Sequence, residues 1–190
     1  QAAFAAFTSY EDVAAVCFDA DKDGDMDLLV GAGGNHKLKE SGLLNHRLFL
    51  NDGKANFTYQ ENAFPAFGYN TGVMVPMDFD ADGDIDVFVG ARSTPLRYGV
   101  TPASAIYVND GKGNYTDQTL SLAPQFSSLG MVTSAVWSNV LGNTNNQLIV
   151  VGDYMYPAVF SYSNGKFVEE KTSLNNLFGW WQSVQVVDMD

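Results

Sequence analysis

Two short acidic segments carry the residue types best suited to chemistry in this chain of 190 residues. The segments DADKDGDMD (19–27) and DFDADGDID (78–86) share the pattern D-x-D-x-D-G-D-x-D. Oxygen ligands at alternate positions, with a glycine at the sixth position that lets the chain curl, suit a hard cation such as Ca²⁺. Without a cation, these closely spaced carboxylates would repel one another. The sequence therefore predicts two calcium-binding turns.

Each turn is expected to supply four side-chain ligands and one backbone carbonyl, from its seventh position. The expected ligands of the first turn are the side chains of Asp19, Asp21, Asp23 and Asp27 and the carbonyl of Asp25. Those of the second turn are the side chains of Asp78, Asp80, Asp82 and Asp86 and the carbonyl of Asp84.

The flanking sequence distinguishes these turns from other calcium loops of similar spacing. An EF-hand needs a bidentate glutamate at the twelfth position, which Val30 and Val89 occupy here within strand-like runs. Nonapeptide calcium repeats would recur every nine residues, and thrombospondin-type repeats are rich in cysteine. This chain has a far longer period and one cysteine.

The acidic turns belong to a repeat whose first aspartates, Asp19 and Asp78, are 59 residues apart. In each copy an apolar run precedes the turn, a second run follows it, and two further runs flank an Asn-Asp-Gly sequence. A third copy begins near residue 131. Its turn has Thr144 at the glycine position. It has no carboxylate at the four ligand positions, which are occupied by Asn139, Leu141, Asn143 and Gln147. We expect no calcium there.

Four short apolar runs per copy predict a four-stranded unit repeated near 60 residues, as in a β-propeller blade. A parallel β-helix has much shorter coils. The predicted fold is an all-β, incomplete β-propeller arc in one partial domain (1–190), with blades at about 13–60, 72–120 and 130–174 and a fourth starting at 179–190. Continuous apolar sequence in VAAVCF predicts a first strand buried on both faces, with Cys17 as a buried thiol.

The repeats resemble the FG-GAP or VCBS repeats of integrin α-subunits and many secreted bacterial proteins. The resemblance rests on DADKDGDMDLLVGAG with RLFLNDGKANFT, and on DFDADGDIDVFVGAR with AIYVNDGKGNYT. The segments GMVTSAVW and GWWQS look most like bacterial relatives of the cartilage acidic protein and the ASPIC/UnbV group. The resemblance implies a propeller of about seven blades with calcium between the first two strands of each blade. We therefore expect the chain to be part of a longer protein and, alone, to be capable of self-association.

The net charge and the apolar runs of the sequence argue against two kinds of partner, nucleic acid and the membrane interior. The net charge of −12 is unsuited to binding nucleic acid, and no apolar run is long enough for membrane insertion. Calcium turns of this kind have affinities suited to calcium outside the cytosol, so we expect an extracellular, cell-surface or periplasmic location.

No common catalytic motif occurs in the sequence, and the calcium ligand sets leave little room for a substrate, so we expect no enzyme activity. The expected role is recognition of a protein or glycan ligand on the face opposite the calcium turns. Long connections there carry His36, Lys37, Lys39, His46, Arg92, Arg97 and Tyr98, of which we expect the histidines to be solvated. Trp180 and Trp181 fit packing better than sugar stacking. A non-catalytic part of a glycan-degrading enzyme and a structural spacer are the alternatives.

Overall fold

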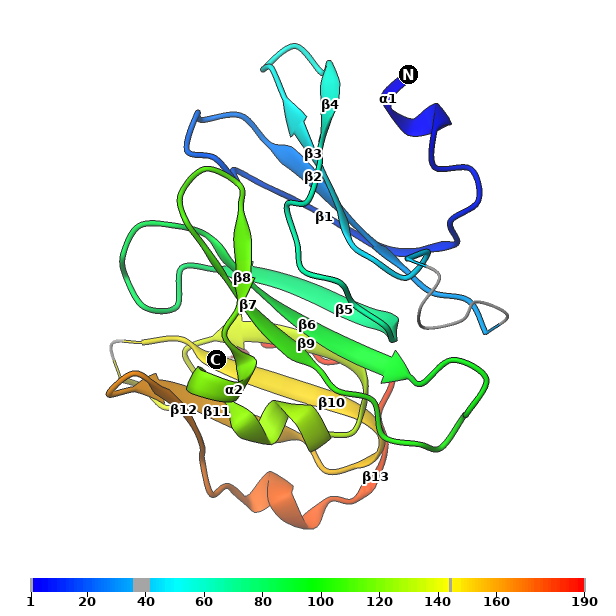
Figure 1. The fold of residues 1–190 in the computed structure, drawn as a ribbon. Coiled ribbons are helices and arrows are strands. Elements are labelled where there is room, and N and C mark those ends of the chain that lie inside the picture. Colours follow the sequence, from blue (N-terminus) through cyan, green and yellow to red (C-terminus); the bar gives the residue numbers. More distant parts are fainter. Residues whose placement is uncertain (1, 36–41, 144, 190) are drawn as a thin grey trace.

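A computed structural model describes residues 2–35, 42–143 and 145–189 of the protein (Figure 1). Three antiparallel β-sheets follow one another along the chain, each built on four consecutive strands. This confirms the predicted all-β, blade-like architecture. Helical structure in the described ranges consists of short segments only: α1 (Ala2–Ala5), α2 (Thr119–Leu122), η2 (Pro124–Ser128) and η3 (Ser173–Asn176). None of these helices is long and apolar enough to cross a membrane.

The strands of the first sheet are β1 (Asp12–Phe18), β2 (Asp27–Ala32), β3 (Arg47–Asn51) and β4 (Phe57–Gln60). Those of the second sheet are β5 (Asn70–Met77), β6 (Asp86–Ser93), β7 (Ala105–Asn109) and β8 (Tyr115–Asp117). The third sheet contains β9 (Met131–Ser138), β10 (Gln147–Met155), β11 (Ala158–Ser163) and β12 (Lys166–Glu169). The two-residue strand β13 (Gly179–Trp180) also pairs with β10.

The first strands of the three sheets lie side by side, because β1 contacts β5 and β5 contacts β9. Both acidic segments form the connection between the first and second strands of their sheet. Figure 1 shows these connections, together with the β3–β4 and β7–β8 hairpins, at one end of the stacked sheets and the β6–β7 connection at the other. The fold thus has a face formed by the acidic turns and an opposite face.

Strand β6 shows how the sheets are held together. Successive side chains of a strand point to opposite faces. Val87 and Val89 belong to the core between the first and second sheets, whereas Phe88 belongs to the core between the second and third sheets. Burial of apolar surface on both sides of one strand therefore makes the second sheet the link between its neighbours.

The prediction that the first strand is buried on both faces was wrong, and so was the prediction of a buried thiol. Cys17 is exposed, and alternate residues of β1 face solvent. Within the described part of the chain, β1 pairs with β2 alone and so lies at the edge of its sheet. The most deeply buried strands are the second ones, β2, β6 and β10, which lie inside their sheets and not at an edge.

The expectation of a solvated His46 was also wrong. Its side chain is buried and its ring lies 4.5 Å from the ring of Phe67, with Phe64 and Tyr107 close by. Neither ring nitrogen has a hydrogen-bond partner among the described residues. Burial, and secondarily the charge of Arg47, lower the pKa of His46 to about 3.

His46 is expected to make the fold sensitive to mild acid. A histidine with a lowered folded-state pKa stabilises the fold fully above its unfolded pKa of about 6.5. This contribution is lost as pH falls from there toward 3, by up to about 1.4 kcal/mol per pH unit. In calcium-saturated urea unfolding, His46→Leu should therefore lose less stability between pH 7 and pH 5 than the unmodified protein. Equal losses in the two proteins would contradict this account, since the carboxylates are common to both.

Candidate metal centre

The first acidic turn gathers three carboxylates at one point. Oxygens of Asp19, Asp21 and Asp27 all lie within 4.8 Å of one another. Asp27 begins β2 and is fully buried; its two oxygens accept hydrogen bonds of 2.8 Å from the backbone N–H groups of Ala20 and Asn51. The N–H of Gly24 donates to Asp19 over 3.0 Å, and Gly24 has a φ of +92°, a conformation for which glycine is best suited. The turn therefore curls its backbone around the carboxylates.

The second turn repeats this geometry one sheet further on. Oxygens of Asp78, Asp80 and Asp86 lie within 4.8 Å of one another. The N–H of Gly83 donates to Asp78 over 3.1 Å, and Asp86, at the start of β6, accepts a 2.9 Å hydrogen bond from the N–H of Asn109. The two turns share the hydrogen bonds from the turn glycine and from the hairpin asparagine, so the sequence repeat is also a repeat of the site. They differ in one bond, because Asp86 Oδ2 lacks the partner that Asp27 Oδ2 has in the N–H of Ala20.

The residues present fit a hard cation. Asp19 Oδ1, Asp78 Oδ1 and Asp86 Oδ2 are buried and have no hydrogen-bond partner among the described residues. The pKa of Asp86 is raised to about 7, mainly by burial. The hydrogen bond from Asn109 opposes this rise, and the nearby carboxylates of Asp80, Asp82 and Asp78 add to it. Burial likewise raises the pKa values of Asp21, Asp27 and Asp80. A divalent cation would favour the charged forms and occupy the unpartnered oxygens.

The remaining predicted ligands lie outside the two triads. Asp23 and Asp82 each accept a 2.9 Å hydrogen bond from the backbone N–H two residues later, which shapes the turn. The carboxylates of Asp25 and Asp84 lie against the hairpin glycines Gly53 and Gly111, so close that a Cβ atom there would be within 3 Å of a carboxylate oxygen. Their side chains therefore contact the hairpin of the same sheet, an arrangement compatible with backbone ligation at this position.

In the third turn, a side-chain amide lies where the other turns have a buried carboxylate. Gln147 begins β10 and is fully buried, as Asp27 and Asp86 are in their strands. Its Oε1 accepts from the N–H groups of Val140 and Leu141, and its Nε2 donates to Asn143 Oδ1 over 3.0 Å and to the carbonyl of Asn145 over 2.7 Å. The amide thus supplies N–H donors where the other turns present carboxylate oxygens. Among the described residues of this turn, no buried side-chain polar atom lacks a hydrogen-bond partner.

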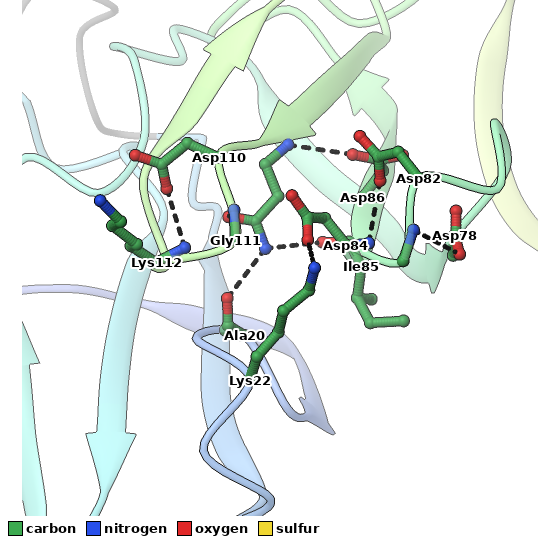
Figure 2. A network of polar contacts seen from close by, with 12 residues as sticks. Ala20, Lys22, Asp78, Asp82, Asp84, Ile85, Asp86, Asp110, Gly111 and Lys112 are labelled. Atoms are coloured by element: carbon green, nitrogen blue, oxygen red, sulfur yellow. Dashed lines mark hydrogen bonds and ion pairs between the residues drawn. The ribbon is translucent and has the colours of Figure 1, made fainter.

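Asn109 links the two turns across the boundary between the first and second sheets. Its backbone N–H orients Asp86, and its side-chain amide donates over 2.8 Å to the carbonyl of Ala20, inside the first turn. Lys22 of the first turn forms an ion pair with Asp84 of the second. Figure 2 shows Ala20 and Lys22 directed toward the second turn from the first. The two candidate sites are therefore parts of one connected network.

Residues of the opposite face are only partly where the sequence suggested. Arg92 and Tyr98 line a cavity there, while Arg97 is exposed and His46 is buried in the core. Trp180 is largely exposed and packs edge-to-face with Tyr154. His36, Lys37 and Lys39 lie outside the described residues, as does Asp190.

Sequence reasoning missed the roles of Asn109 and Gln147. In the sequence, the Asn-Asp-Gly segment only separates two apolar runs, whereas in the structure the N–H of its asparagine orients the buried aspartate in both sheets. The recurrence of that asparagine with each acidic turn was the available signal. For Gln147, the loss of a carboxylate was visible, but its hydrogen bonds within the turn were not.

Removing the Asn109 side chain should destabilise the protein more than removing its counterpart in the first sheet. Asn109→Ala leaves the Ala20 carbonyl without its buried donor, a loss of about 1–3 kcal/mol. Asn51→Ala is the matched control, since its amide donates to Met26 in an exposed position. Urea unfolding of both variants with calcium present measures the difference. Equal losses of unfolding free energy in the two variants would show that the hydrogen bond from Asn109 to the carbonyl of Ala20 contributes nothing to stability.

Comparison with known families agrees with this repeat. Residues 19–89 match the FG-GAP-like repeat family. No curated protein matches the chain. The matched segment begins at the first aspartate of the first turn, includes the whole second turn and ends within β6. Residues 19–89, which contain both candidate metal sites, are therefore an FG-GAP-like repeat segment.

Proposed function

We propose that this protein is a calcium-stabilised recognition module of β-propeller type that acts outside the cytosol. In this proposal the acidic turns bind two calcium ions and fix neighbouring blades, and the opposite face binds a ligand. The observation that carries the metal assignment is the pair of aspartate triads with buried, unpartnered oxygens. Their match to an FG-GAP-like repeat supports it.

Calcium is the cation that the donor set favours. The available ligands are carboxylate oxygens on flexible turns, which suit a large, hard cation that accepts six to eight oxygens. The histidine nitrogens and cysteine sulfur that would select zinc are absent from both triads. Residues Asp19, Asp21 and Asp27 would hold one ion, and Asp78, Asp80 and Asp86 the other.

A location outside the cytosol follows from the expected affinity. Calcium modules of extracellular proteins have dissociation constants of about 10⁻⁴ to 10⁻³ M, which cytosolic calcium is too dilute to saturate. Calcium held this way is structural. Its ligands come mainly from protein carboxylates, which leave little coordination for a substrate, and we propose that the protein is not an enzyme.

The opposite face is the proposed recognition surface because it contains a cavity of about 430 Å³. That volume falls within the range of small-molecule sites. A purely structural spacer would need the calcium turns to hold its blades together, but it would have no use for a cavity on the opposite face. Loops on a rigid β scaffold are common positions for binding residues.

Calcium should raise the melting temperature of the protein, and a chelator should lower it. Calcium binding at each site adds about 2.7 kcal/mol to the free energy of unfolding when the calcium concentration is one hundred times the dissociation constant of that site. Thermal unfolding followed by circular dichroism, with millimolar calcium or with EGTA, measures the shift. Magnesium at equal concentration is the control and should give a smaller shift. A melting temperature indifferent to EGTA would refute the metal assignment.

Single substitutions should remove the two sites separately. Asp21→Ala and Asp80→Ala each delete one ligand of one triad and should each lower bound calcium from two ions per chain to one. Asn143→Ala, in the third turn, should leave two ions bound. Equilibrium dialysis with metal analysis counts them. Three ions in the unmodified protein would show that the third turn also binds calcium.

A further inference from the structure

The side chain of Lys22 crosses from the first acidic turn to the second. Lys22 is the fourth residue of its turn, and its φ of +65° agrees with the +64° of Ala81, the fourth residue of the second turn. The backbone therefore has the same conformation at this position in both turns, and only the side chains differ. The ammonium group of Lys22 forms an ion pair with Asp84 of the second turn.

Two further contacts place this charge at the second turn. Lys22 Nζ lies 3.6 Å from the point where a Cβ atom on Gly83 would stand. The N–H of Gly83 donates to Asp78, a member of the second triad. Figure 2 shows the side chain of Lys22 extending toward Asp84 and ending beside it. The positive charge thus lies at the second turn, although its backbone belongs to the first.

The ion pair between Lys22 and Asp84 is partly shielded from solvent. The side chain of Asp84 is 14% exposed, and that of Lys22 is 48% exposed. Asp84 Oδ1 is buried and has no hydrogen-bond partner among the described residues apart from this ion pair. Charges near a shielded carboxylate interact more strongly with it than charges in open water do. Lys22 is therefore the counter-ion of Asp84.

The boundary between the second and third turns has no such lysine. Ala81 and Asn145 hold the positions there that correspond to Lys22 and Asp84. Both residues line a cavity of about 190 Å³ formed by these two turns. The space that the lysine side chain occupies at the first boundary is thus left open at the second. The lysine occurs where two acidic turns are neighbours, and it is missing where the third turn has no carboxylate ligands.

The charge of Lys22 affects the calcium-free and the calcium-bound turn in opposite directions. Without calcium, an ammonium group beside Asp84 offsets part of the repulsion among the aspartates of the second turn. A calcium ion held by Asp78, Asp80 and Asp86 would carry two positive charges and would be repelled by the ammonium group.

We propose that Lys22, a residue of the neighbouring sheet, sets the calcium affinity of the second turn. It is a tethered cation that stabilises the calcium-free turn and weakens calcium binding there. The inference rests on the proposed function, because it concerns one of the two proposed calcium sites.

The test is a calcium titration of the ¹⁵N-labelled protein by NMR at low ionic strength. The backbone amide signals of Gly24 and Gly83, the sixth residues of the two turns, report the occupancy of each turn separately. Lys22→Met removes the charge and keeps an unbranched side chain. The midpoint of the Gly83 signal should move to a calcium concentration about threefold to tenfold lower. An unchanged midpoint, or a move to higher calcium, would overturn the proposal.

The matched control is Lys112→Met, which removes the same charge from the β7–β8 hairpin. Figure 2 shows the side chain of Lys112 directed away from the second turn, so the Gly83 midpoint should stay in place. Lys22→Arg keeps the positive charge and should also leave it unchanged. An equal shift with Lys112→Met would show an effect of net charge alone and would overturn the assignment to Lys22.

Salt separates an effect of charge from an effect of packing. In about 0.5 M sodium chloride, the difference between Lys22→Met and the unmodified protein should shrink, because salt screens interactions between charges. Lost packing would not depend on salt in this way, so a difference of the same size at both salt concentrations would contradict the proposal.

Thermal unfolding gives a second measurement on the same proteins. In EGTA, Lys22→Met should melt at a lower temperature than the unmodified protein, because the carboxylates lose their counter-ion. With saturating calcium the difference should be smaller. Equal differences in the two conditions would identify the lysine as a contact indifferent to calcium and overturn the proposal.

The titration also distinguishes failure of this inference from failure of the metal assignment. If Gly24 and Gly83 both respond to calcium and Lys22→Met leaves the Gly83 midpoint in place, the inference about Lys22 is wrong and the metal assignment stands. If neither amide responds in the unmodified protein, the metal assignment itself is wrong, and this inference fails with it.

Discussion

Repulsion among clustered carboxylates is the constraint on which the rest of this structure depends. Each acidic turn contains five aspartates within nine residues. One of the five is buried at the start of the second strand of its sheet. The buried member cannot relieve the repulsion by moving into solvent, because backbone N–H groups from the turn or the hairpin hold it in place. In the proposed function, a bound cation would convert this repulsion into a connection between turn, strand and hairpin.

The same turns connect one sheet to the next. Without the hydrogen bond from Asn109 to Ala20 and the ion pair between Lys22 and Asp84, the first two sheets would be joined mainly by apolar packing, which is non-directional. Directional contacts at the acidic face fix how the sheets sit relative to one another. The alignment of β1, β5 and β9, and with it the wall of the cavity at their other end, depends on that placement.

The repeat made much of the fold predictable. The spacing of the acidic turns and apolar runs predicted four-stranded sheets, and the two triads consist of three of the five aspartates expected in each turn. The errors concerned burial that depends on distant neighbours. Cys17 lies in an apolar run, yet its strand is at a sheet edge, and His46 lies in a polar segment, yet the rings of Phe64, Phe67 and Tyr107 enclose it.

The cavity was beyond sequence reasoning for the same reason. Its wall combines Val13, Asn70 and Thr133, which come from three sheets and follow no common spacing in the chain. Gln147 was partly predictable, because its position in the repeat identified it as the replacement for an aspartate. The structure adds that its amide oxygen accepts a hydrogen bond from Val140 and that its amide nitrogen donates to Asn143 and Asn145.

A crystal structure of the protein grown with calcium, with anomalous diffraction data, tests the central claim most directly. The account predicts anomalous peaks within carboxylate bonding distance of Asp19, Asp21 and Asp27 and of Asp78, Asp80 and Asp86, with no peak beside Gln147. Density for water alone in both triads at millimolar calcium would contradict it.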